Sequence, residues 1–308
     1  FFDKVCSGRR IAFNPNMINM VLTFSRILDP GSKMHTLKNL TGFYGDFDFS
    51  HQDILRFMDI LEENYDEYLS HLFESSNKVI KRNTNVCYFD CTNFYFEKES
   101  EDEDVYDEIT GELIKGLLKY GVSKEHRPNP IVQMGLFMDN QGIPITYELF
   151  PGNTNNCLTY RPNFGRIKKQ FDLGRVISVA DKGMTTGDNI WYTINTPTHD
   201  GYVFSMSIRG AEKSIKDYVL EQEGYEWLGT EYKRKSRKSP RTIQVSSVSG
   251  KKIKKQVNEK QVVFWSEKYA KRAKAEREAA LTKARDLAKN PGNYTRATSY
   301  GAAKYVKK

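Results

Sequence analysis

Apolar residues near the start of the chain recur at helical spacing and predict helices over residues 14–81. The positions that define the first helix are Ile18, Val21, Leu22, Ile27 and Leu28. Asp29-Pro30-Gly31-Ser32 should end it, because proline and glycine interrupt helical hydrogen bonding. Farther along, Ser50 and Asp53 have the spacing of a capping box before another apolar run. We therefore expect a small helical unit.

A period of two replaces the helical period from Asn85 onward. Two sets of side chains alternate over residues 86–92, which is typical of a β-strand. Asp139-Asn140-Gln141-Gly142 then separates two apolar runs, as in a β-hairpin. The hairpin strands are predicted over 131–138 and 143–150, helices over 158–171 and 187–194, and further strands over 175–180 and 202–206. Residues 97–112 hold nine Asp and Glu against one Lys and predict a solvated loop. This order of elements indicates an α/β fold.

The pattern changes again past Ser207. Short polar strands over 227–232, 243–248 and 261–265 are separated by lysine-rich turns, and a helix is predicted over 267–289. The chain is thus predicted to have three parts. These are a helical N-terminal unit (1–84), an incomplete α/β core (85–206) and an inserted basic β-rich module ending in a Lys/Ala-rich helix (207–308).

Charge is distributed unevenly along the 308 residues. The formal net charge of +8 combines −7 over residues 1–206 with +15 over residues 207–308. A dense basic segment favours a polyanionic partner, most often nucleic acid, although a solvated lysine-rich surface would have the same composition. No apolar run approaches the roughly 18 residues of a membrane span, so no membrane partner is expected.

The four cysteines are too few and too scattered for a disulfide scaffold, which favours a reducing cytoplasm. Cys87 and Cys91 have the spacing of half a metal site. They lie on one face of an apolar strand without a second Cys or His pair, so two packed thiols are the favoured interpretation.

Two aspartates lie where strands end. Asp90 interrupts the apolar strand after Phe89, and Asp181 follows the apolar run that ends at Ala180. Neighbouring carboxylates stay ionised together when a cation neutralises them, and carboxylate oxygens suit Mg²⁺ or Mn²⁺. For either aspartate alone, an ordinary turn-capping role is the competing interpretation.

Several blocks of sequence resemble bacterial insertion-sequence transposases of the DDE type. They are Tyr88-Phe89-Asp90-Cys91-Thr92-Asn93, the run from Lys119 to Asp139 that contains Ser123-Lys124-Glu125-His126-Arg127-Pro128, Pro151-Gly152-Asn153-Thr154-Asn155, and Val179-Ala180-Asp181-Lys182-Gly183. The resemblance implies an RNase H-like mixed-sheet core in which a β-rich insertion precedes a third acid. Asp90 and Asp181 match the first two metal-binding acids, with two Mg²⁺ (or Mn²⁺) per complete site. The family's DNA-contacting residues would fall near Lys124, His126 and Arg127.

The third acid departs from the family pattern. Tyr269, Arg272, Glu276 and Lys283 have the family spacing, but their helix presents alanines where bulky apolar neighbours are expected. We therefore expect the third acid beyond Lys308, with Glu276 as the alternative. Phe1 is not preceded by an initiator methionine, and no terminal signal precedes Lys308, so the sequence is expected to be a fragment truncated at both ends.

The resemblance implies cleavage and strand transfer of insertion-sequence DNA. Its partners would be double-stranded DNA, as element ends and target, and a second copy in a homodimer. Its location would be the bacterial cytoplasm, in association with the nucleoid. Two alternatives stay open: a metal-dependent nuclease of the same superfamily, and a catalytically incomplete DNA-binding remnant.

Overall fold

The computed structural model of the chain describes residues 1–293, 295 and 302–306. It divides into two compact units, Phe1–Ser205 and Met206–Lys308, and each is described by itself below.

The first unit begins with helices, as the apolar spacing predicts for residues 14–81. They are α1 (Phe2–Val5), α2 (Pro15–Leu28), α3 (Lys33–Lys38), the 3₁₀ turn η1 (Leu40–Gly42), α4 (His51–Glu63) and α5 (Tyr65–Val79). Helix α1 lies before the range 14–81 and was not predicted. The predicted capping box is confirmed: Ser50 accepts a hydrogen bond from Asp53 N, and Ser50 N donates to the Asp53 carboxylate. Ile18, Ile54 and Phe57 are buried in a separate small core of this region.

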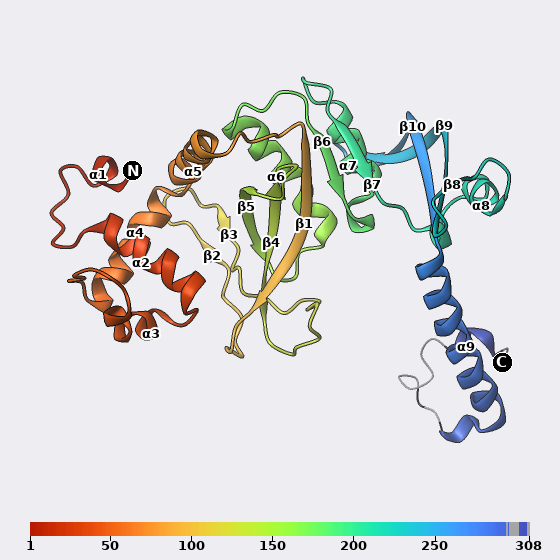
Figure 1. Cartoon of the computed structure of the whole chain (residues 1–308), viewed down its shortest axis with the longest axis horizontal. Helices are drawn as coiled ribbons and strands as arrows, with labels where there is room; N and C mark the ends of the chain where they lie inside the picture. Colours follow the sequence, from red (N-terminus) through yellow and green to blue (C-terminus); the bar gives the residue numbers. More distant parts are fainter. Residues whose placement is uncertain (294, 296–301, 307–308) are drawn as a thin grey trace. The chain divides into compact units, whose positions relative to one another are not determined.

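A five-stranded mixed sheet follows the helices (Figure 1). Its strands are β1 (Val86–Tyr95), β4 (Ile131–Met138), β5 (Pro144–Pro151), β6 (Ile177–Ala180) and β7 (Gly201–Phe204). They lie in the order β5-β4-β1-β6-β7; β4 is antiparallel to β1 and β5, whereas β6 is parallel to β1 and β7. The predicted RNase H-like α/β fold class is thereby confirmed.

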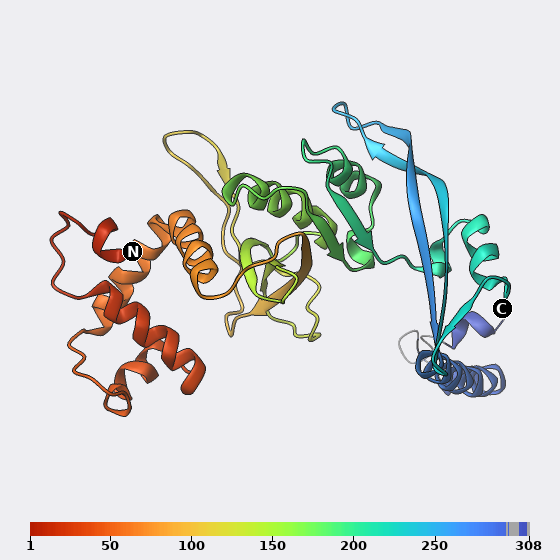
Figure 2. The same cartoon turned by 45° about the horizontal axis from the view of Figure 1, so that its top comes forward.

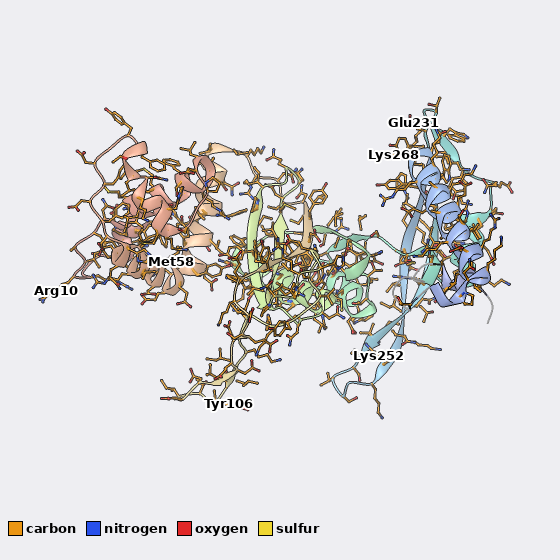
Figure 3. The ribbon with its side chains drawn as sticks, turned by 90° about the horizontal axis from the view of Figure 1, so that it is seen from below. Arg10, Met58, Tyr106, Glu231, Lys252 and Lys268 are labelled. Atoms are coloured by element: carbon orange, nitrogen blue, oxygen red, sulfur yellow. The ribbon has the colours of Figure 1, made fainter. Side chains whose placement is uncertain are left out.

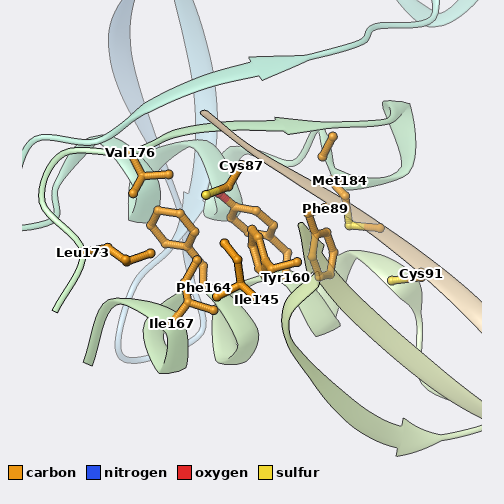
Figure 4. Close-up of a cluster of buried hydrophobic side chains, with 12 residues drawn as sticks. Cys87, Phe89, Cys91, Ile145, Tyr160, Phe164, Ile167, Leu173, Val176 and Met184 are labelled. Carbon is orange, nitrogen blue, oxygen red and sulfur yellow. The ribbon is translucent and has the colours of Figure 1, made fainter. Parts of the chain in front are cut away.

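Two helices and a short turn connect the later strands of the sheet. These are α6 (Asn156–Gln170), η2 (Lys182–Met184) and α7 (Gly187–Ile194). Cys87 and Phe89 of β1 point into a core that also contains Tyr160 and Phe164 of α6 (Figure 4). The alternation of β1 therefore gives the sheet one buried face, and both thiols, Cys87 and Cys91, are packed as expected.

The acidic segment departs from the predicted loop. It contains a small antiparallel hairpin of β2 (Val105–Tyr106) and β3 (Leu113–Ile114), and Tyr106 lies near the end of this arm (Figure 3). Asp107 closes the turn by accepting hydrogen bonds from the amides of Ile109 and Thr110 at 2.8 and 2.6 Å. The number of acidic residues in a segment does not show whether an aspartate closes a local turn or lies in a solvated loop.

The second unit is built around a long two-stranded ribbon (Figure 2). Its elements are η3 (Ile208–Gly210), α8 (Lys213–Leu220), β8 (Glu226–Leu228), β9 (Tyr232–Ser246), β10 (Lys252–Ser266), α9 (Glu267–Lys289), η4 (Pro291–Asn293) and η5 (Ala303–Tyr305). The sheet order is β10-β9-β8. The predicted helix over 267–289 is confirmed, and α8 was not predicted.

The prediction of short strands separated by lysine-rich turns is wrong for most of this unit. β9 and β10 each run for 15 residues, and residues 233–235, expected in a turn, lie within β9. The strand tolerates these charges because Lys233 and Lys235 lie against aromatic rings and their ammonium groups donate hydrogen bonds to oxygen atoms. None of the helices in the described part of the chain is both long and apolar enough to cross a lipid bilayer.

Candidate active site

Asp90 lies midway along β1, and Asp181 directly follows the neighbouring parallel strand β6. The register of β1 and β6 pairs Phe89 with Ala180. Asp90 is the next residue of β1, and Asp181 is the first residue after β6. Extending the register by one residue therefore places Asp90 beside Asp181, at a strand separation of about 4.8 Å. Both aspartates are exposed, on the face opposite the buried Phe89.

One oxygen of each carboxylate is held by the backbone. Cys91 N donates to Asp90 Oδ1 at 2.8 Å, and Gly183 N donates to Asp181 Oδ1 at 2.8 Å. Within the described part of the chain, neither Oδ2 has a hydrogen-bond or ion-pair partner. The two side chains are thus oriented by nearby backbone amides, while Oδ2 of each stays available.

The loop after the acidic arm covers the second half of β1. Because β6 ends at Ala180, no strand among the described residues pairs with this edge of β1 beyond Phe89. Lys124 Nζ donates to the carbonyl of Cys91, and Lys124 N donates to Asn93 Oδ1 at 3.2 Å. The ammonium group therefore lies next to the residue that follows Asp90.

The charged groups around Asp90 affect the pKa of the Cys91 thiol. Burial raises the pKa of Cys91, and a hydrogen bond with Thr159 opposes that effect. The charges of Asp90 and Asp181 raise the pKa further, and that of Lys124 lowers it. Two carboxylates and one ammonium group are therefore close enough to act on the same sulfur.

The other basic residues of the loop lie farther along β1. The Arg127 guanidinium stacks 4.1 Å from the centroid of the Tyr95 ring and is 3.4 Å from Glu125. His126 is exposed, with a positive φ of 56° that a non-glycine residue seldom adopts. The structure thus brings Lys124 and Arg127 to β1, whereas the His126 side chain has no hydrogen bond, ion pair or ring contact with β1 among the described residues.

The alternative third acid belongs to the second unit. Glu276 lies on α9, where its carboxylate is exposed and accepts a hydrogen bond from Arg272 Nε at 2.8 Å. Among residues 1–293, 295 and 302–306, no group of three or more His, Cys, Asp or Glu side chains is placed to hold a metal ion. The identity of the third acid stays a prediction.

Comparisons with known proteins were made at three levels. No protein-family model matches the chain, and no curated protein matches its sequence. Among solved structures, the chain is similar to a piggyBac transposase in a synaptic complex with hairpin DNA, with a TM-score of 0.37 and 9% identity over 83% of this chain and 55% of that one. It is also similar to the Mos1 mariner paired-end complex with Mn, with a TM-score of 0.25 and 12% identity over 68% of this chain and 70% of that one. The chain spans about half of the piggyBac protein. Similarity at this level does not identify a function.

Proposed function

We propose that the chain is the greater part of the catalytic region of a DDE transposase, which cleaves DNA at the ends of a mobile element and joins them to a target. The observation that supports the proposal is the β1–β6 register, which pairs Phe89 with Ala180, the residues immediately before Asp90 and Asp181. An insertion-sequence element in a bacterial cell is the setting that the sequence resemblance implies.

The carboxylate pair has the chemistry of a site for hard divalent cations. Its two Oδ2 atoms lack partners among the described residues, and carboxylate oxygens are preferred ligands of Mg²⁺ and Mn²⁺. Asp90 and Asp181 would hold the metal, with a third acid completing the set. When bound, two Mg²⁺ ions supply activation of water or a 3′-hydroxyl and neutralisation of the leaving oxygen.

The remaining residues of the site would position the DNA. Lys124 and Arg127 lie along β1 beyond the carboxylates, where cations can contact phosphates on either side of the reacting bond. The second unit, with its large positive charge, would supply sequence-independent affinity. Backbone contacts of this kind fix the register of the duplex without selecting a sequence.

Metal binding is the first test, because it does not require a complete site. We expect Mn²⁺ titrated into the full chain, followed by electron paramagnetic resonance, to bind at a site that Asp90→Asn and Asp181→Asn each weaken strongly. Asp59→Asn, an exposed aspartate on α4, is the matched control. Unchanged Mn²⁺ binding in both site variants would exclude the proposed metal site.

Product analysis then separates the transposase from its alternatives. A transposase joins labelled element ends to a second duplex, whereas a nuclease of the same superfamily yields only cleaved strands. DNA binding without Mn²⁺ binding would favour a non-catalytic remnant, an alternative supported by the lack of a three-ligand cluster in the described part of the chain.

A further inference from the structure

The ribbon of β9 and β10 has two faces with different chemistry. On one face, here called the inner face, Lys235 is only 5% exposed although it carries a charge. Its ammonium group donates to the carbonyls of Glu221 and Glu223 at 2.7 and 3.3 Å. It also lies 4.3 Å from the centroid of the Tyr218 ring. These partners offset the cost of burying the charge, and the cation is not available to a ligand.

The other inner-face cations are also engaged. Lys233 Nζ donates to Gln222 at 2.9 Å, and Arg237 Nε donates to Gln261 at 2.8 Å. The guanidinium of Arg241 pairs with Glu259 at 2.7 Å. The positive charge of the inner face is therefore used within the protein.

The opposite face, here called the polar face, is fully exposed. Over residues 238–244 of β9 and 254–260 of β10, its lysine and amide side chains are Lys238, Gln244, Lys254, Gln256, Asn258 and Lys260. None of these six side chains has a hydrogen bond or ion pair with another described residue. No Asp or Glu lies on this face between Ser236 and Val262.

The pairing of residues on the polar face does not serve folding. Lys238 lies directly opposite Lys260, and like charges in that position destabilise a sheet. Gln244 lies opposite Lys254, which leaves no carboxylate to offset the repulsion. A surface with unpaired cations and unpaired amides in one plane is complementary to a polyanion that also presents hydrogen-bonding groups.

We propose that the polar face of the β9–β10 ribbon enters the major groove of duplex DNA, where the amides contact base edges and the lysines contact phosphates. The choice of DNA as the polyanion rests on the proposed function. The major groove, about 12 Å wide, admits a two-stranded β-ribbon. Asn and Gln can donate to and accept from adenine in that groove, so this surface selects sequence and does not only supply charge.

The spacing along the ribbon fits this role. Side chains on one face of a strand repeat every two residues, or about 6.7 Å, which is close to two base-pair steps of about 3.4 Å each. Gln256 and Asn258 are such neighbours on β10, flanked on the same face by Lys254 and Lys260. Two amides can therefore meet base pairs two steps apart while a lysine on either side reaches the backbone.

The test uses the full chain and selection from a random pool of DNA duplexes. We expect the wild-type chain to enrich a short motif, and Gln256→Ala/Asn258→Ala to lose the preference at two positions. Affinity for the preferred duplex should fall by at least roughly 30-fold, toward the value for unrelated sequences. Lys254→Gln/Lys260→Gln should instead weaken binding to all duplexes alike and reduce the salt dependence of log affinity by about 2.

A matched control and the contrary outcomes complete the design. Gln52→Ala/Gln141→Ala removes two exposed amides from the first unit and should leave the motif unchanged. The proposal is overturned by a wild-type chain without a preferred motif, by a motif that persists in Gln256→Ala/Asn258→Ala, or by tighter binding to double-stranded RNA. Asp90→Asn/Asp181→Asn should keep the motif, so failure of the catalytic proposal and failure of this one give different results.

Discussion

Removing the guanidinium of Arg82 should strongly destabilise the first unit. Arg82 lies between α5 and β1, and its side chain and that of Asp139 are 2% and 0% exposed. Nε donates to Asp139 Oδ2, and the two terminal nitrogens donate to Ser76 Oγ and to the carbonyls of Ile143 and Pro144. The ion pair thus connects the end of the helical region to the turn between β4 and β5.

The size of the effect follows from what remains after the substitution. Arg82→Met keeps an apolar stem against Phe73 but leaves the buried Asp139 carboxylate without its cation. Breaking a buried pair by removing one partner costs about 3–5 kcal/mol. The amides of Gln141 and Ile143 still donate to Asp139 Oδ1, so we expect a loss of about 3 kcal/mol, near the lower end of that range.

Urea denaturation followed by Trp191 fluorescence measures this loss in the first unit alone. The Trp227→Phe/Trp265→Phe background removes the tryptophans of the second unit, which could otherwise unfold separately. Asp139→Asn leaves the buried Arg82 guanidinium without its counter-charge and should also destabilise the unit, and the double variant should lose less than the sum of the two. A loss below about 1 kcal/mol for Arg82→Met would refute the reasoning, because it would mean that the carboxylate is solvated or repaired locally.

Three further predictions concern the site and its surroundings. Gly183→Ala should weaken Mn²⁺ binding about tenfold with little change in stability, because a Cβ there would lie 3.0 Å from Asp181 Oδ1. Gly174→Ala is the control, because a Cβ at that position meets nothing within 4 Å. Equal Mn²⁺ affinities in the two variants would contradict the prediction. The chain should bind DNA but cleave it poorly in Mg²⁺, since two acids do not complete the site; robust cleavage that Glu276→Ala abolishes would instead identify Glu276 as the third acid. The Cys87 thiol should resist iodoacetamide in the native protein up to about pH 10, because burial raises its pKa to about 12 and the thiol is reactive only as thiolate; rapid native-state labelling of Cys87, located by mass spectrometry, would contradict its burial.

The parts of the fold that depend on short-range patterns could be predicted from the sequence. The capping box at Ser50 and the alternation of buried and exposed residues in β1 each depend on residues only a few positions apart. Both features are present in the structure. The register that aligns Asp90 with Asp181 depends on packing between segments about 90 residues apart, so sequence analysis could state it only as an expectation.

The lysine-rich ribbon shows why the remainder could not be predicted. A run such as Lys233-Arg234-Lys235 has the composition of a turn, yet the ammonium of Lys235 is buried among carbonyls and rings of other segments. The alternation that separates the two faces is visible in the sequence of β9. It becomes informative only when the opposite strand is known, because Lys238 and Lys260 are far apart in the chain and adjacent in the sheet.

The early end of β6 has a consequence for how the protein behaves at high concentration. A strand edge with free amides and carbonyls is a template on which another chain can add a strand, and exposed edges are a common origin of aggregation. At Cys91 that edge is blocked, because the amide donates to Asp90 Oδ1 and the carbonyl accepts from Lys124. The side chains of Asp90 and Lys124 therefore prevent a neighbouring molecule from extending the sheet at this point of β1.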